Sequence, residues 1–451
     1  MFKLKVDLLN GNILKSVLLF ALPLLISNFF QQLYNTIDTM IVGNYLGDVS
    51  LAAIGASTPV YDLLIGFALG IGNGLSIVTA RSYGAMDEDK IKKSVAGSIV
   101  IGAVVTVVVM ALCSFLLYPL LELLNTPEAI IDEAYSYIFV ITIAIGVTFL
   151  YNLCAGLLRA IGNSVMPLVF LILSALLNVV LDLLLITQFD MGIQGAAVAT
   201  VIAQGVSGVL CIFYILRKAK ILVPHRVHFN VGSEMYKDLW SQGLSMGFMM
   251  AIVSSGTLIL QYAINELGYL TIAAHTGARK LTMFFMIPVS SLAMSISTFV
   301  SQNKGANQMD RVRKSVFYAN MLSIGWGIII SVLMLILARP LIQILSGSSE
   351  AIVIDNGAKY LMINAPFFGV LGIVLNVRNA LQGLGSKTLP LVSSIIEFIG
   401  KIIFVVILIP EMGYMGVILC EPLIWCAMGI QLMYSFYKSP NIQEMFVLAE
   451  A

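Results

Sequence analysis

Long apolar stretches separated by short polar ones recur along the whole chain. A helix of about 20 mostly apolar residues is long enough to cross the hydrocarbon core of a bilayer. The pattern predicts twelve such helices, and several exceed about 25 residues, so we expect them to be tilted or kinked. The expected ranges are 14–45, 51–81, 95–121, 131–158, 164–188, 193–216, 239–267, 270–302, 315–345, 353–380, 388–409 and 413–437.

Composition supports this interpretation. The 451 residues are 59% hydrophobic and 11% charged, with a mean hydropathy of +0.96, whereas soluble domains carry about 25% charged residues. The fold class is therefore predicted to be an all-α polytopic membrane protein. The net charge of +1 says nothing about partners, and no basic tract with interleaved aromatic residues indicates nucleic-acid binding. No GxxxxGK[ST] motif occurs, so we expect no ATP hydrolysis. HExxH is absent, and GLSMG (243–247) fits GxSxG without a strand before it, so we do not expect an enzyme.

The cysteines and the first residues add little chemistry. Five cysteines fall inside predicted spans without metal-ligand spacing, which predicts small apolar core residues. The stretch KVDLLNGNILKS leads into the first span without a small-residue cleavage site, so we expect no cleavable signal.

Basic residues indicate the orientation. About 20 of the 25 Lys and Arg lie at the two ends of the chain or in the connections after even-numbered spans. Arg339 and Lys359 fall on the other side, and Arg279, Lys280 and Lys401 fall inside spans. The excess of positive charge marks the cytoplasmic side. Both termini are therefore predicted to be cytoplasmic.

The chain contains an internal repeat. YGAMDEDKIKKSV (83–95) returns as KGANQMDRVRKSV (304–316), a shift of 221 residues. LLRAIGNSVMPL (157–168) returns as ALQGLGSKTLPL (380–391), shifted by 223, and MGIQG (191–195) as MGYMG (412–416), shifted by 221.

Because each half holds six spans, we expect two six-helix lobes related by a pseudo-two-fold axis along the membrane normal, with a substrate site between them. The predicted division is an N-terminal lobe at 1–220, a cytoplasmic linker at 221–238 and a C-terminal lobe at 239–451.

Polar groups inside the first-half spans are candidates for function. Ionisable side chains within membrane helices cost about 2.5–3.5 kcal/mol each on insertion scales and usually mark a function. Gln31, Tyr34, Asn35 and Asp38 form one polar stripe at helical spacing, and Asn178 and Asp182 form another. Thr200 and Asn152 add further oxygens. Two buried carboxylates with amide and hydroxyl oxygens suit Na⁺, and desolvated carboxylates equally suit H⁺.

The second half does not repeat this set. At the same shift, Lys401 replaces Asn178 and Val405 replaces Asp182. We expect Glu397 to pair with Lys401, four residues later, with Arg279 as an alternative partner across helices. Further candidates are Asp62, at a cavity or a span end, Glu421, which has no predicted role, and His275, which we expect to be a helix-contact residue rather than a metal ligand.

Prolines and small residues suggest where helices bend or pack. Pro23 interrupts the first span fifteen residues before Asp38, so we expect a hinge there. The run GFALGIGNG (66–74) suits close helix packing. Methionines such as Met249 and Met286 would give an adaptable substrate surface.

Several segments taken in order resemble the multidrug and toxic-compound extrusion (MATE) family, prokaryotic type. The segments that carry the resemblance are IDTMIVGNYLGDVSLAAIGAS (37–57), LLRAIGNSVMPL (157–168), LNVVLDLLLI (177–186) and MGIQGAAVATVIAQ (191–204). The acid that one branch of this family carries at the start of the second half is absent from GLSMGFMMAIVSSG (243–256). A second cation site of that kind is therefore not expected.

The resemblance implies a V-shaped central cavity and export of amphipathic, cationic drugs in exchange for Na⁺ or H⁺, with no other cofactor. It also implies a monomer in the bacterial inner membrane. The cation site it implies contains Asp38, Asn178, Asp182 and Thr200, with Asn152, Tyr34 and Tyr137 nearby. Gln31, Asn35, Arg279, Glu397, Met249 and Met286 are expected at the substrate cavity. A lipid-linked oligosaccharide flippase of the same superfamily is the alternative, although it would need a strongly cationic cavity.

Overall fold

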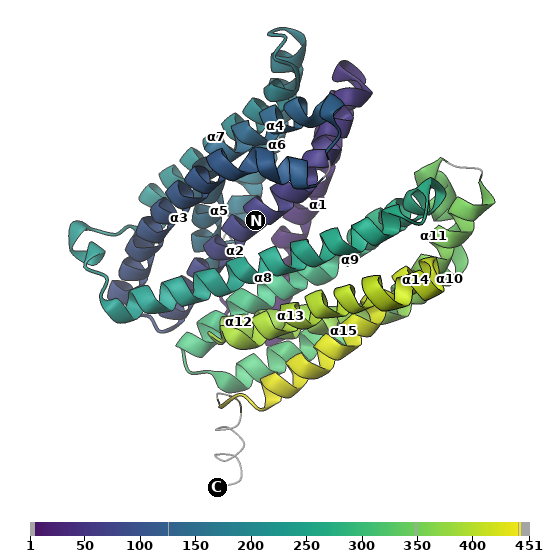
Figure 1. Ribbon diagram of the computed structural model, residues 1–451. Coiled ribbons are helices and arrows are strands. Elements are labelled where there is room, and N and C mark those ends of the chain that lie inside the picture. The colour runs from purple at the N-terminus through teal and green to yellow at the C-terminus, as the bar shows by residue number, and fades with distance from the viewer. Residues whose placement is uncertain (1–4, 125, 348–349, 441, 443–451) are drawn as a thin grey trace. The chain divides into compact units, whose positions relative to one another are not determined.

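The computed structural model describes residues 5–124, 126–347, 350–440 and 442, which contain helices and no strands (Figure 1). The first half comprises α1 (Ile13–Leu46), α2 (Asp48–Gly84), α3 (Glu88–Leu123), α4 (Glu128–Ile143), α5 (Ile145–Ala160), α6 (Val165–Thr187) and α7 (Gly192–Lys218). The connection holds η1 (Lys220–Leu222) and η2 (Arg226–Phe229). The second half comprises α8 (Ser233–Asn265), α9 (Tyr269–Gly305), α10 (Met309–Ser346), α11 (Ala351–Asn364), η3 (Ala365–Phe367), α12 (Phe368–Gly383), α13 (Thr388–Ile403), η4 (Phe404–Leu408), α14 (Ile409–Met412) and α15 (Tyr414–Tyr437).

The predicted membrane architecture is confirmed among the described residues. Eleven helical segments are long and apolar enough to span a bilayer, and the α4–α5 pair brings the number to twelve. That pair corrects one prediction, because the span expected at 131–158 is not a continuous helix but bends by 50° at Ala144. Gly146 follows the break, and a Cβ there would lie 2.9 Å from Thr106 Cγ2 on α3. The missing side chain therefore lets the bent segment pack closely.

Two second-half spans are also irregular, each beside a proline. Pro366 lies in η3, between α11 and α12. Pro410 follows η4, a π-helical segment between α13 and α14. Proline has no N–H to donate within a helix, so the hydrogen-bond ladder rearranges around it.

The described chain packs into two compact units. Unit 1 comprises Leu22–Ala251 with the stretch that ends at Asp7, and unit 2 comprises Leu8–Ala21 with the chain from Ile252 onward. Helices α1 and α8 therefore contribute residues to both units. These boundaries differ from the predicted lobe boundaries at residues 220 and 239, because the connection and the first part of α8 pack within unit 1. The two ends of the chain, which carry the orientation prediction, lie outside the described residues.

Helix α3 is almost wholly apolar, yet one of its faces is buried and the others are exposed. Ile101, Val105 and Val109 recur every fourth residue and are buried. Val107 and Phe115 on other faces are exposed. An exposed face without polar groups suits lipid chains, as expected for a membrane span.

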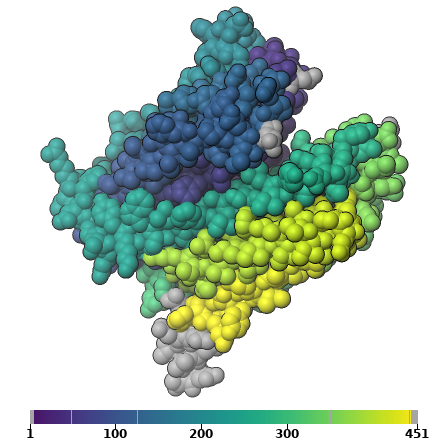
Figure 2. Space-filling model, in the orientation of Figure 1, coloured from purple at the N-terminus to yellow at the C-terminus, as the bar shows by residue number. Residues whose placement is uncertain are grey.

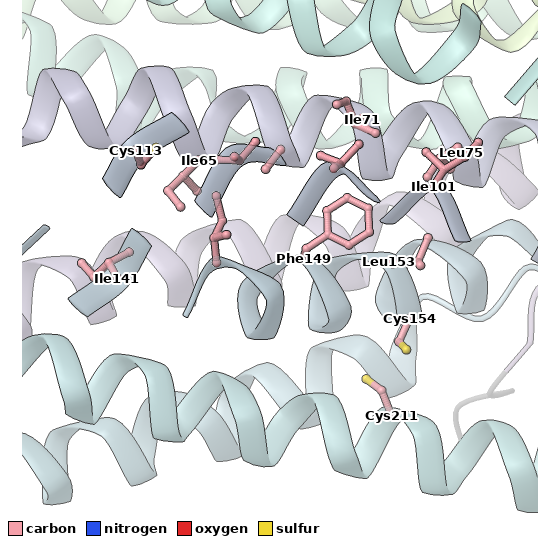
Figure 3. Close-up of a cluster of buried hydrophobic side chains, with 14 of the residues drawn as sticks. Ile65, Ile71, Leu75, Ile101, Cys113, Ile141, Phe149, Leu153, Cys154 and Cys211 are labelled. Carbon is pink, nitrogen blue, oxygen red and sulfur yellow. The ribbon is translucent and has the colours of Figure 1, made fainter. Parts of the chain in front are cut away.

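The core of unit 1 is built from side chains of several helices. Figure 3 shows the Phe149 ring of α5 among Ile71 of α2 and Ile101 of α3. Gly102 makes room for this ring, because a Cβ at that position would overlap it. Cys154 and Cys211 are buried free thiols in the same core, as predicted for the cysteines.

In unit 2, α13 and α15 pack side by side, and both are visible in yellow-green and yellow in Figure 2. Ile399 and Ile403 on α13, and Ile430 on α15, are exposed. Lys401 and Glu421, on the same two helices, are buried. These two charged side chains therefore point into the unit, and the three exposed isoleucines point away from it.

Glycines in 66–74 place α8 directly against α2 within unit 1. A Cβ added at Gly70 would lie 2.5 Å from Met246 O, and one at Gly74 would lie 2.6 Å from Gln242 O. Both neighbours are backbone atoms, which cannot rotate out of the way. The predicted close packing of this run is confirmed.

We therefore expect Gly74→Leu to lower the thermal midpoint of the purified protein, since overpacking costs about 1–3 kcal/mol. Gly55→Leu on the same helix is the matched control, because nothing lies within 4 Å of a Cβ there. Scanning fluorimetry in detergent would compare the two, and equal midpoints would contradict the close contact.

Candidate functional site

Two carboxylates meet inside unit 1. Asp38 on α1 and Asp182 on α6 lie within hydrogen-bond distance of each other. Within the described part of the chain neither forms an ion pair with Lys, Arg or His. Two ionised carboxylates at this separation repel each other strongly. The pair is therefore stable only when it holds a proton or a cation.

Asn178 on α6 contacts the second of these acids and links it to Thr200 on α7. In one orientation of the Asn178 amide, Nδ2 donates to Thr200 Oγ1 at 3.3 Å. With its nitrogen and oxygen exchanged, Nδ2 donates to Asp182 Oδ2 at 2.9 Å and Oδ1 accepts from the Thr200 N–H at 3.2 Å. The second orientation satisfies both ends of the amide. The Thr200 hydroxyl also lies 3.3 Å from the Tyr34 hydroxyl on α1.

One oxygen of each carboxylate remains without a donor. Asp38 Oδ1 and Asp182 Oδ1 are buried and have no hydrogen-bond partner among the described residues. Buried polar atoms of this kind are rare and require an explanation, such as a bound ion or water. No cluster of three or more His, Cys, Asp or Glu suited to a metal occurs in the described residues. Any bound cation here would therefore rely on the two acids together with neutral oxygens.

Helix α6 directs its polar residues inward because its remaining residues are apolar. Asn178 and Asp182 are 0% exposed, whereas Leu176 and Val180 are 63% and 61% exposed. Residues four apart share a helix face. Lipid accepts the leucine and valine side chains at little cost, so burial of the polar face is the stable arrangement.

Two tyrosines complete the surroundings of Asp38. Tyr137 on α4 is buried and interacts electrostatically with Asp38. Tyr61 on α2 also interacts with Asp38. Tyr61 was not predicted, whereas its neighbour Asp62 was; Asp62 is exposed and interacts with Tyr61. The spacing within PVYDLLIG gives no signal that distinguishes the two.

Asn152 belongs to an adjoining polar group rather than to the acid pair. Its Nδ2 donates to the Thr148 carbonyl oxygen, 2.8 Å away on the same helix. Thr148 Oγ1 donates to Gln204 Oε1 on α7 at 2.5 Å. Gln204 lies one turn beyond Thr200, so the polar face of α7 extends from the acid pair toward α5. Thr148 and Gln204 were not predicted.

The predicted cavity residues fall into two groups. Gln31 and Asn35 are exposed on α1, while Met249 and Met286 are buried. Pro23 is buried inside a continuous α1, and its carbonyl oxygen accepts the Ser27 hydroxyl at 2.8 Å. The roles of these five residues stay predictions.

The family model MatE matches two stretches of the chain, residues 23–184 and 246–407. The two stretches are offset by 223 residues, which agrees with the repeat in the sequence. The chain belongs to the MatE family. The predicted resemblance is thereby confirmed, and the family is one of transporters rather than enzymes.

Relatives of this MatE protein cover almost all of it. "Probable multidrug resistance protein YoeA" of Bacillus subtilis (strain 168) is 27% identical over 435 residues, covering 94% of this chain and 93% of its own. The "FAD transporter" of Shewanella oneidensis is 24% identical over 442 residues, covering 95% of each chain. The fold is similar to "Crystal structure of MATE in the bent conformation", with a TM-score of 0.88, 21% identity, and coverage of 97% of this chain and 98% of that one.

Unit 2 of this MatE protein contains buried charges that are paired. Arg279 Nη1 on α9 donates to both carboxylate oxygens of Glu421 on α15, at 2.7 and 2.8 Å. The Tyr360 hydroxyl on α11 donates to Glu421 Oε2 at 3.0 Å. The alternative pairing of Arg279 with Glu397 is therefore wrong, because α15 supplies a nearer acid. His275 contacts Tyr360 and Tyr414, as expected for a helix-contact residue.

Glu397 has two basic neighbours. Lys401 Nζ donates to Glu397 Oε1 at 3.0 Å, which confirms the predicted pair. Arg378 Nη2 lies 3.6 Å from Glu397 Oε2, and Arg378 Nε donates to Ser393 Oγ at 3.0 Å. Arg378 was not among the basic residues predicted to lie inside spans. Arg378 is nevertheless buried on α12, with an exposed fraction of 7%.

Breaking the Arg279 pair should destabilise unit 2. Arg279→Met leaves Glu421 buried without its cation, and loss of one partner of a buried pair costs about 3–5 kcal/mol. Arg279→Met combined with Glu421→Gln should recover most of the lost thermal midpoint. Arg339→Met is the control, since its partner Asp355 is exposed and such pairs contribute about 0–1 kcal/mol. Equal losses for Arg279→Met and Arg339→Met would contradict the assignment.

Proposed function

We propose that this MatE protein is an antiporter that exports amphipathic, cationic drugs in exchange for Na⁺ or H⁺. The observation that carries the proposal is the Asp38–Asp182 pair, in which each acid keeps one buried oxygen without a donor. An uncompensated carboxylate inside a membrane helix is costly, so it is retained where a cation binds and leaves.

The neutral groups around the acids suit either ion. A carboxylate pair can share one proton. Alternatively, the acids with the Asn178 amide and the hydroxyls of Thr200 and Tyr34 supply oxygen atoms for a hard cation. Desolvation strengthens the electrostatic attraction for whichever ion enters.

Coupling requires only that the ion and the drug stabilise different states of the protein. A ligand shifts a conformational equilibrium by its difference in affinity for the two states. A cation that joins Asp38 to Asp182 links α1 to α6, and its release frees α1. A bend of α1 at Pro23 would then move the polar stripe that carries Asp38.

The names of the relatives support the drug class, because YoeA is described as a multidrug resistance protein. The relative described as an FAD transporter makes an anionic dinucleotide the second candidate. The flippase alternative is less favoured, because a pyrophosphate needs free basic groups. Arg279 and Lys401 are each held by a carboxylate.

Efflux from proteoliposomes would test the proposal, with a Na⁺ gradient and a pH gradient imposed separately. Either gradient should accelerate export of a fluorescent organic cation by wild type, and FAD serves as the second substrate. We expect Asp182→Asn and Asp38→Asn to reduce the gradient-driven rate to the rate without a gradient. Asp355→Asn, at an exposed acid, is the matched control and should transport like wild type. Undiminished gradient-driven export by both site variants would refute the assignment.

A further inference from the structure

Positions related by the repeat form polar groups in both units. At the shift of 223, Tyr360 corresponds to Tyr137 and Lys401 to Asn178. The matched segments give Thr257 as the counterpart of Tyr34. The MGIQG and MGYMG motifs, shifted by 221, give Glu421 as the counterpart of Thr200. Four members of the unit 1 group therefore have polar counterparts in unit 2.

The unit 2 group, like the unit 1 group, joins side chains from several helices. Lys401 Nζ donates to Thr257 Oγ1 on α8 at 3.2 Å, so α13 meets α8 through these counterparts. In unit 1, Tyr34 of α1 meets Thr200 of α7. The Tyr360 hydroxyl reaches Glu421 directly. The duplicated scaffold has thus retained a buried polar centre in each unit.

The charges of the two centres differ. The unit 1 centre contains two acids and no basic partner among the described residues. In unit 2, Glu421 is neutralised by Arg279, while Glu397 lies between Lys401 at 3.0 Å and Arg378 at 3.6 Å. Lys401 is 2% exposed, so its ammonium group belongs to the interior.

The residues that create this difference occupy three repeat-related positions. Glu397 corresponds to Ser174, Lys401 to Asn178, and Arg378 to Ala155. The acid and its two bases therefore occur together in unit 2 and are all absent from unit 1. This joint occurrence is expected if the bases serve to neutralise the acid, because a buried unpaired carboxylate is unstable.

We propose that Lys401 and Arg378 act as tethered cations that fill the unit 2 counterpart of the coupling site. A mobile cation can be released to either side of the membrane, whereas an ammonium group on a side chain cannot leave. Unit 2 then keeps its charge balance throughout transport, and unit 1 alone exchanges a cation. This inference rests on the proposed function of the Asp38–Asp182 pair.

The proposal predicts that removing both tethered cations creates a second cation site. Lys401→Asn alone should not do so, because Arg378 remains beside Glu397. The double variant Lys401→Asn/Arg378→Ala restores the unit 1 residues at both positions and leaves Glu397 without a basic partner. We expect it to bind one cation more than wild type, which doubles the number if wild type binds one.

Two measurements on the purified full chain would count the ions. Saturation binding of ²²Na⁺ reports sodium, and the infrared carbonyl stretch of protonated carboxyl groups reports protons. Adding Glu397→Ser, the unit 1 residue, to the double variant should remove the extra ion and return the number to that of wild type. A folded double variant that binds no more of either ion would overturn the inference.

The same measurements separate this inference from the proposed function. Asp38→Asn/Asp182→Asn should lose the ion bound by wild type, and failure to do so contradicts the proposed function alone. In that background, Lys401→Asn/Arg378→Ala should restore one bound ion.

If the Lys401→Asn/Arg378→Ala variant unfolds in low salt at neutral pH, high Na⁺ or acid should restore its thermal midpoint. If neither high Na⁺ nor acid restores the midpoint, a mobile ion cannot replace the tethered cations, which contradicts the inference.

Discussion

The cost of placing a carboxylate away from water, inside helices that face lipid, constrains this protein more than any other interaction. An acid in such a place must be protonated, paired or bound to a cation. Asp38 and Asp182 lie together without a basic partner among the described residues, and each keeps one buried oxygen without a donor. Two acids in this arrangement need a proton or a cation, and this need underlies the proposed ion coupling.

The second half of the chain meets the same constraint with its own side chains. Glu421 is buried and Glu397 is partly buried, and their basic partners are Arg279, Lys401 and Arg378. Duplication provided two similar helical frameworks, and substitution at a few repeat-related positions gave them different electrostatics. In the proposed mechanism, these internal ion pairs keep the charge of unit 2 constant while unit 1 exchanges a cation.

In both units, packing decides which side of each helix faces the interior, and therefore where the charged groups lie. The exposed leucines and valines of α6 face away from the protein interior, so Asn178 and Asp182 on the opposite side of the helix are buried. Gly70 and Gly74 allow α8 to approach the backbone of α2, and Gly102 accommodates Phe149. Small residues therefore create close contacts between helices.

The number of spans, the duplication and the residues that share a helix face could be predicted from the amino-acid sequence. Those properties depend on local spacing, which is why Asn178 with Asp182, and Glu397 with Lys401, could be recognised. Which helices adjoin follows from the folded structure. It brought Asp38 to Asp182, chose Glu421 over Glu397 as the partner of Arg279, and placed Arg378 in the interior. It also bent the chain at Ala144. Contacts between residues more than 140 positions apart depend on how apolar surfaces and glycines fit together, and helical periodicity contains no information about that fit.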